Sequence, residues 1–222
     1  MKYVVVTVPV GLFLSILIAT LLNSKIKGTS IYRTLYFLPS VTMAAAVAMV
    51  WKWIYNEKMG ILNSVIRALG GKGIGWLTDP KIALYSVMIV GLWMSVGYNM
   101  IILLAGMQGI SKSYYEAAQI DGAGRLRTFF QIVFPLLKPT TATLVILYAL
   151  SLWNDYLLPS LILTDKSLYT IPIATKLFQG TYSNDMDLLM AALVMAIIPV
   201  IILYIALQKY IIAGVVAGAV KS

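Results

Sequence analysis

Seven positions in two apolar stretches of the chain are candidates for holding a small polar molecule. Six of them have polar side chains, and the seventh, a leucine, shares a helix face with them. Small-molecule sites place a few amides, hydroxyls and carboxylates among apolar and aromatic side chains. Helical spacing groups these positions on two faces, one in each stretch. The positions in the stretch 82–111 are Ser95, Tyr98 and Asn99, and those in the stretch 139–164 are Leu147, Ser151, Asn154 and Asp155.

The segment from Gln108 to Lys138 is a second candidate for function, because it is compact and charged between two apolar stretches. Ser113 and Glu116 have the spacing of a capping box, in which Glu116 bonds back to the backbone N–H of Ser113. The residues DGAG then break this helix, and Gly122 is expected to adopt a backbone angle that a β-branched residue tolerates poorly. A second helix is predicted to begin near Arg125. Its predicted apolar side consists of Leu126, Phe129, Phe130, Val133 and Leu137.

This segment is therefore expected to form a short helix, a bend and a second helix at a membrane surface. Ala117 and Ala118 would leave a face of small side chains that another protein could approach closely. An interfacial helix-turn-helix without a partner explains the same pattern on physical grounds alone.

The elements that must position these residues are apolar helices. The chain has 222 residues, 60% hydrophobic and 11% charged, whereas soluble domains are about half apolar and about a quarter charged. Spanning a bilayer takes roughly 20 mostly apolar residues. The uncharged or nearly uncharged stretches are 4–22, 34–51, 82–111, 139–164 and 188–208. We therefore predict an all-α, polytopic membrane helix bundle with five transmembrane helices, because a chain in lipid must satisfy its own backbone.

The candidate polar residues also have a purely structural interpretation. Gly91, Ser95 and Ser151 could simply permit close packing of helices. Asp155 follows Pro139 by 16 residues, or about 24 Å along a helix at roughly 1.5 Å per residue. That distance would place Asp155 near the outer interface, among aromatic side chains that form a belt. An ionisable residue inside a span is nevertheless a functional candidate, so both interpretations stay open.

Composition excludes several classes of function. The chain has no cysteine and no histidine, which excludes disulfides, His-based catalytic triads and the usual zinc sites. No G-x-x-x-x-G-K-[ST] motif occurs, so no P-loop binds ATP here. The net charge of +9 comes from basic residues scattered singly between apolar segments, a pattern typical of membrane proteins rather than of nucleic-acid binding. The first apolar stretch is too long for a signal peptide and lacks an A-x-A-like cleavage site.

The charged segment resembles the EAA loop of permeases from binding-protein-dependent ABC importers. The family pattern is Glu-Ala-Ala, three residues, Gly, nine residues and Ile-x-Leu-Pro, and the one departure is Phe134 in place of Leu. In that family the loop, here residues 108–138, is the coupling helix that sits in a cleft of the ATPase subunit. The resemblance implies coupling roles for Glu116, Ala117, Ala118, Asp121, Gly122, Ile132 and Pro135.

The resemblance covers nearly the whole chain and narrows to carbohydrate permeases of the maltose type. The residues WNDYLLP, from Trp153 to Pro159, resemble a signature of that family. Tyr98 and the stretch from Leu147 to Asp155 match positions that line its sugar site. The segment 33–63 is similar to one of the two partner permeases and the segment 178–222 to the other, so the choice between the two roles stays open.

The resemblance implies a permease domain over residues 1–222 in a bacterial or archaeal cell (inner) membrane. It would form a sugar path with a second permease, and an external sugar-binding protein would contact the loop Gly180–Asp187. A dimeric ATPase would bind ATP and Mg²⁺, while this chain binds no cofactor and performs no covalent chemistry. The family has six helices and the match begins at its second, so the first helix is expected to be missing.

Three alternatives remain. Within the same class, the solute could be glycerol phosphate or another polyol derivative. A secondary transporter or channel would need ionisable residues along several helices, but only Asp155 is available. A truncated, inactive permease fragment is the third.

Lys and Arg counts on the two sides of the membrane differ by one residue when residues 108–138 are placed in the cytoplasm, so charge alone does not fix the orientation.

Overall fold

The computed structural model describes residues 2–24, 27–176, 178 and 186–219, and among these residues it contains helices and no strand. The first half contains α1 (Lys2–Asn23), α2 (Thr29–Val41), α3 (Ala44–Ile54), α4 (Ile61–Ala68) and α5 (Pro80–Gln108). The segment after α5 contains α6 (Lys112–Ile120), α7 (Arg125–Thr128), the π-helix η1 (Phe129–Val133) and α8 (Phe134–Leu136). The last part contains α9 (Lys138–Trp153), α10 (Leu157–Ile162), the 3₁₀ helix η2 (Lys166–Leu168), α11 (Ile171–Lys176) and α12 (Met186–Ala219).

Hydropathy correctly predicts where the membrane-crossing helices lie. Within the described residues, four helical segments are long and apolar enough to span a bilayer: Lys2–Asn23, Pro80–Gln108, Lys138–Ile162 and Met186–Ala206. The pair α2 and α3 passes the same test together, which gives up to five spans. The all-α membrane bundle predicted from the sequence is confirmed.

The predicted span over residues 34–51 is not one straight helix. The axes of α2 and α3 are bent by 97° across Thr42 and Met43, whose backbones are extended or outside the helical region. Side chains in the last turn of α2 bond to its own carbonyls: Ser40 Oγ donates to Phe37 O and Thr42 Oγ1 donates to Leu38 O. Such local bonds compete with continuation of a helix, and hydropathy carries no sign of them.

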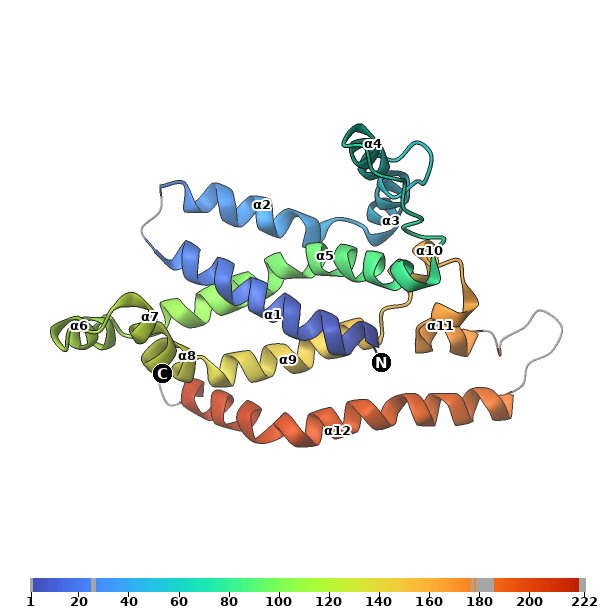
Figure 1. The fold of residues 1–222 in the computed structure, drawn as a ribbon. Helices are drawn as coiled ribbons and strands as arrows, with labels where there is room; N and C mark the ends of the chain where they lie inside the picture. Colours follow the sequence, from blue (N-terminus) through green and yellow to red (C-terminus); the bar gives the residue numbers. More distant parts are fainter. Residues whose placement is uncertain (1, 25–26, 177, 179–185, 220–222) are drawn as a thin grey trace.

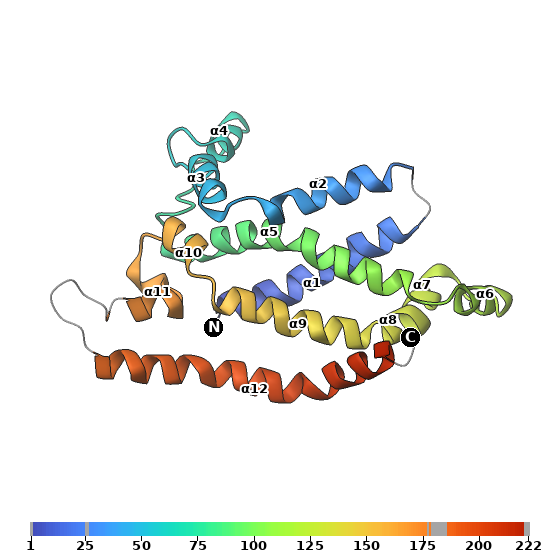
Figure 2. The ribbon, with the colours of Figure 1, turned by 180° about the vertical axis from the view of Figure 1, so that it is seen from behind.

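The helices α1, α5 and α9 form the centre of the bundle. In Figures 1 and 2, α2 lies along one side of this group and α12 along the other, and the contacts of α2 with α5 and of α12 with α9 agree with that arrangement. The short helices α6 to α8 lie at one end, and α4, α10 and α11 lie at the opposite end. The two regions singled out by the sequence are therefore a lengthwise seam between α5 and α9 and one end of the bundle.

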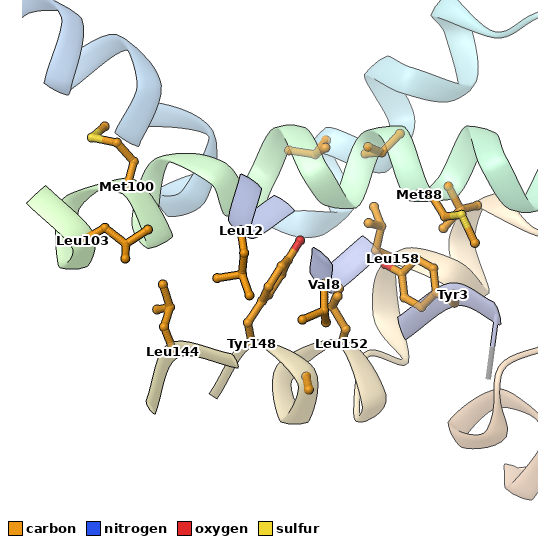
Figure 3. Close-up of a cluster of buried hydrophobic side chains, with 14 of the residues drawn as sticks. Tyr3, Val8, Leu12, Met88, Met100, Leu103, Leu144, Tyr148, Leu152 and Leu158 are labelled. Atoms are coloured by element: carbon orange, nitrogen blue, oxygen red, sulfur yellow. The ribbon is translucent and has the colours of Figure 1, made fainter. Parts of the chain in front are cut away.

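A continuous apolar core joins the three central helices. Its fully buried side chains include Met100 and Leu103 of α5 and Leu144 of α9 (Figure 3). Buried Ser15 of α1 donates to Gly11 O on its own helix and also to Val96 O of α5, at 3.2 Å. At Gly97 the backbone of α2 approaches α5 so closely that a Cβ would collide with the carbonyl of Tyr36. The absence of a side chain at Gly97 thus allows the backbones of α2 and α5 to approach closely.

The loop between α3 and α5 is held together by one buried amide. Asn63 of α4 is fully buried, and its Nδ2 donates to Glu57 O and Ile74 O while its Oδ1 accepts from Ile74 N and Trp76 Nε1. Helix α4 and its C-cap still present apolar side chains to the surroundings, because Val65 is 52% and Leu69, the C-cap residue, 84% exposed.

Candidate functional site

A cavity of about 500 Å³ lies along the seam between α5 and α9 and reaches the start of α3 and the end of α2. Six of the seven polar-face positions predicted from the sequence line it. They are Ser95, Tyr98, Asn99, Leu147, Ser151 and Asp155. Tyr98 and Leu147 are each about half exposed, at 51% and 50%, so they face the open part of the cavity. Two helices therefore contribute one polar face each to a single space of small-molecule size.

Asp155 lies where the helical path of the chain breaks between α9 and α10. Its Oδ1 accepts a hydrogen bond from the backbone N–H of Leu158 at 3.4 Å, and its Oδ2 accepts one from the Tyr3 hydroxyl at 3.4 Å. The first contact satisfies a donor at the start of α10, and the second connects α9 to α1. The side chain is therefore both a structural link and part of the cavity wall.

A second polar pair crosses the bundle between α5 and α9. The hydroxyls of Ser95 and Tyr148 lie 2.6 Å apart, and Figure 3 shows the Tyr148 ring extending from α9 towards α5. Both tyrosines occupy space above a glycine: a Cβ on Gly11 would lie 2.6 Å from Tyr148 Oη, and a Cβ on Gly91 would lie 2.8 Å from Tyr3 Oη. The packing interpretation of Gly91 is thus supported, while Ser95 packs and also lines the cavity.

Asn99 is the buried amide in the cavity wall. The residue is 2% exposed, and its Nδ2 has no hydrogen-bond partner among the described residues. A buried amide without a partner is costly in free energy. Because Asn99 lines the cavity, a bound molecule could supply the missing acceptor.

Asn154 does not join this group. Helix α9 ends at Trp153 and Asn154 is its C-cap, so the helical spacing that predicted a shared face with Ser151 stops one residue too early. Its Nδ2 donates back to Leu150 O at 2.9 Å. The residue lines a different cavity of about 450 Å³, towards α11 and α12, where Lys176 Nζ also lies 4.8 Å from the centre of the Tyr156 ring.

The segment 108–138 forms the predicted short helix and bend. The helix α6 ends in a glycine cap: Gly122 N–H donates to Gln119 O and Ala123 N–H donates to Ala118 O, with Gly122 at φ 71°. This is the Schellman arrangement, which requires a left-handed residue after the helix. The expected special backbone of Gly122 is confirmed.

The start of α6 differs from the predicted capping box. Ser111 is the N-cap residue, and its Oγ accepts from Ser113 N at 3.4 Å and lies 2.9 Å from Ser113 Oγ. The backbone donor that Glu116 was expected to satisfy is therefore served by Ser111. The helix starts earlier because Ser111, two residues after the C-cap of α5, offers the same capping chemistry.

The two alanines of α6 point in different directions. Ala118 is 3% exposed, whereas Ala117, Glu116 and Asp121 are exposed. Successive helical residues differ by about 100° around the axis, so a pair of adjacent alanines cannot form one face. The outer face instead carries Tyr114 and Ile120, which are 51% and 86% exposed. Sequence analysis missed these two residues, although their i, i+3 spacing with Ala117 is the signal that identifies them.

The second half of the segment contains a π-helical turn. The N–H of Phe134 donates to Phe129 O, an i to i+5 bond, directly before Pro135, which has no N–H to donate. The extra residue in this turn rotates the residues on either side relative to each other. Val133 and Leu137 are consequently buried, while Leu126 and Phe130 are 76% and 63% exposed. The single predicted apolar side is therefore wrong.

The remaining predicted coupling residues lie within or beside this turn. Ile132 is half-buried and Pro135 is exposed.

Between α6 and the ends of α1 and α5 there is a cavity of about 460 Å³, whose lining includes the polar residues Asn23 and Tyr115. Burial raises the pKa of the Tyr115 hydroxyl. Figure 1 shows that α6 projects from this end of the bundle, beyond the ends of the long helices.

Two further expectations concern metals and the binding protein. Among the described residues, no group of three or more His, Cys, Asp or Glu side chains is arranged to hold a metal ion. The loop Gly180–Asp187 lies largely outside the described residues.

Comparison with known proteins places this architecture in a family. Residues 11–216 match the model of the family described as binding-protein-dependent transport system inner membrane component. The probable ABC transporter permease protein YesP of Bacillus subtilis is 34% identical over 205 residues, covering 86% of this chain and 65% of YesP. The melibiose/raffinose/stachyose import permease protein MelC of the same organism is 49% identical over 112 residues, covering 50% of this chain and 41% of MelC.

A solved structure has the same fold. The crystal structure of a bacterial alginate ABC transporter, in complex with a periplasmic protein bound to alginate pentasaccharide, contains a chain with a TM-score of 0.80 and 19% identity. The match covers 94% of this chain and 76% of that one. The chain spans about two thirds or less of the curated relatives named above.

Proposed function

Because the chain belongs to the family of binding-protein-dependent transport system inner membrane components, we propose that it is the permease subunit of an ATP-driven carbohydrate importer. It forms a solute path together with a second permease in the cell (inner) membrane of a bacterium or archaeon. A dimeric ATPase binds ATP and Mg²⁺ and drives the cycle, and an external sugar-binding protein delivers the solute. The chain itself performs no covalent chemistry.

The observation that carries the proposal is the spatial separation of two candidate sites on one bundle. The cavity between α5 and α9 lies along the membrane-crossing helices. The exposed helix α6, with Glu116 and the glycine cap at Gly122, projects from one end of the same helices. A transporter needs a polar path inside the spans and a separate contact with its energy source, and this chain has a candidate for each.

The proposed mechanism is mechanical. Residues Glu116, Ala117, Ala118, Asp121, Gly122, Ile132 and Pro135 form or support the contact with the ATPase. ATP binding draws the coupling segments together, and the connection from α6 through η1 and α8 transmits this movement to α9. The opened path then receives sugar, whose hydroxyl groups bond to the amides, hydroxyls and carboxylate in the cavity.

Uptake tests the proposal directly. The chain is co-expressed with a partner permease, an ATPase and a sugar-binding protein, and the assembly is reconstituted in proteoliposomes with ATP. Labelled melibiose and raffinose are the probes, chosen because the relative MelC is named for the import of these sugars. We expect ATP-dependent accumulation of at least one sugar. An assembled complex that hydrolyses ATP but accumulates neither sugar contradicts the proposal.

A further inference from the structure

The cavity between α5 and α9 has an uneven charge distribution. Asp155 is the one ionisable carboxylate in its wall, and none of the described residues that line it is basic. The other polar lining residues named above carry hydroxyl or amide groups. A solute in this cavity therefore meets one acidic side chain and no basic side chain among the described residues that line it.

Asp155 accepts two long hydrogen bonds, both at 3.4 Å. Each of its two oxygens accepts one hydrogen bond, from a hydroxyl and from a backbone N–H respectively. An ionised carboxyl accepts at both oxygens in this way, and a protonated one keeps part of that acceptor capacity. Neither donor carries a charge, so neither partner neutralises the negative charge of an ionised Asp155.

Six buried side-chain atoms among the described residues lack a hydrogen-bond partner, and the one whose residue lines this cavity belongs to Asn99. It is 2% exposed, and its Nδ2 lacks a partner among the described residues. The side chains around the cavity therefore include an unused N–H donor at Asn99 and acceptor capacity at Asp155. A hydroxyl group can satisfy both kinds of partner, because it donates one hydrogen bond and accepts others.

We infer that this cavity selects uncharged or cationic polyhydroxylated solutes and discriminates against anionic ones. The inference rests on the proposed function, since it names the substrate class of the same cavity. Glycerol phosphate and acidic sugars are disfavoured, although the resemblance alone leaves glycerol phosphate open. At about 6 Å and an effective dielectric constant of about 20, repulsion between two unit charges corresponds to roughly a hundredfold in affinity.

The absence of cysteine from the sequence makes the cavity's potential measurable. Leu147→Cys and Ser151→Cys place one reporter thiol each in the cavity wall. The full chain, co-expressed with its partners in permeabilised membranes at low salt, is treated with three methanethiosulfonates: sulfonatoethyl, trimethylammonioethyl and an uncharged analogue. Rates are normalised to those of a free thiol in solution. Ser113→Cys, on the exposed start of α6, is the reference outside the cavity.

The quantity to compare is the ratio of the normalised reaction rate of the cationic reagent to that of the anionic reagent. We expect this ratio to be roughly tenfold or more higher at positions 147 and 151 than at position 113. Adding Asp155→Asn should bring this ratio close to the reference value, because the amide retains an acceptor for Leu158 N without the charge. Asp155→Glu should preserve the ratio. A ratio equal to the reference, a preference for the anion, or a ratio unchanged by Asp155→Asn overturns the inference. Complete lack of reaction at both positions also overturns it, because a solute path must be accessible.

This outcome is separable from that of the proposed function. If melibiose or raffinose uptake is ATP-dependent but the reagents show no charge preference, only the charge selectivity is lost. If the preference is present but no ATP-dependent uptake occurs, the carbohydrate-importer assignment fails while the potential of the cavity stands.

Discussion

The hydroxyls of Ser95 and Tyr148 lie 2.6 Å apart and join α5 to α9 at the wall of the cavity. The phenol ring reaches this position because Gly11 of α1 has no side chain to obstruct it. The pair therefore depends on three helices at once, and it fixes the relative positions of the two helices that line the candidate solute path.

The first prediction concerns the solute path. Tyr98→Ala should reduce uptake of the transported sugar by roughly threefold to tenfold at limiting concentration, since it removes a hydroxyl and part of an aromatic wall worth about 1 kcal/mol. Tyr98 lines the cavity and is half exposed. Asn154→Ala is the matched control, because Asn154 lies in the other cavity. Equal losses in the two variants, measured by initial uptake rates at equal protein abundance, would mean that this cavity is not the path.

The second prediction concerns Glu116. This side chain is exposed, and Ser111 caps α6, so Glu116→Ala should leave abundance and membrane insertion unchanged. It should nevertheless weaken ATPase co-purification or uncouple ATP hydrolysis from uptake. Ser111→Ala provides the contrast, since losing a cap costs about 1 kcal/mol of helix stability. Normal ATPase retention and normal transport in the Glu116 variant would remove this residue from the coupling contact.

The third prediction concerns Gly122. Its φ of 71° is a left-handed conformation, which costs other residues roughly 1–2 kcal/mol. Gly122→Val should therefore displace α6 and reduce ATPase association more severely than Glu116→Ala does. Gly124→Ala is the control, because Gly124 has φ −65° and its Cβ would meet nothing within 4 Å. The measurement is the amount of ATPase that co-purifies with each glycine variant. Similar ATPase retention in the two variants would contradict the role of the glycine cap.

The fourth prediction concerns Gly97. Gly97→Ala should destabilise the protein, because the new Cβ would collide with the backbone carbonyl of Tyr36 and force α2 away from α5. Overpacking of this kind typically costs about 1–3 kcal/mol. The readout is the thermal midpoint of the purified protein, compared with Gly106→Ala, where flexible side chains of Leu137 and Thr140 can move aside. A midpoint no lower than that of the Gly106 variant would refute the close contact.

The fifth prediction concerns Asn63. Asn63→Ala removes four hydrogen bonds and leaves the backbone N–H and carbonyl of the half-buried Ile74 and the Trp76 indole N–H without this partner. Each unsatisfied buried group costs about 1–3 kcal/mol, so the loop between α3 and α5 should become sensitive to protease while the spans remain inserted. Ser64→Ala, at an exposed neighbouring position, should leave the loop resistant. Equal cleavage of both variants would argue against Asn63 as the centre of the loop.

Apolar composition was sufficient to predict the spans, since lipid imposes a length and a hydropathy on any helix that crosses it. The exceptions arise from local backbone chemistry. The bend between α2 and α3, the end of α9 before Asn154 and the π-turn before Pro135 each interrupt a periodicity that the sequence analysis extended too far.

The contacts within the site were harder to predict for a different reason. Tyr3 and Asp155 are separated by 152 positions, and the sequence gives no indication that α1 lies against the break after α9. Ser95 and Ser151 were identified because each lies on a face with helical spacing. Tyr148 was missed because its role depends on Gly11, a partner on another helix.

The tyrosine-over-glycine contacts have a consequence for sequence divergence in this protein. Tyr3 covers Gly91, and Tyr148 covers Gly11, so α1 supplies the large residue in one pair and the small residue in the other. Enlarging position 11 requires shortening position 148, and enlarging position 91 requires shortening position 3. Single substitutions at these four positions should be deleterious, while reciprocal exchanges within a pair should restore the volume. The pairs thus act as two volume-conserving units, and substitutions within each should be strongly epistatic.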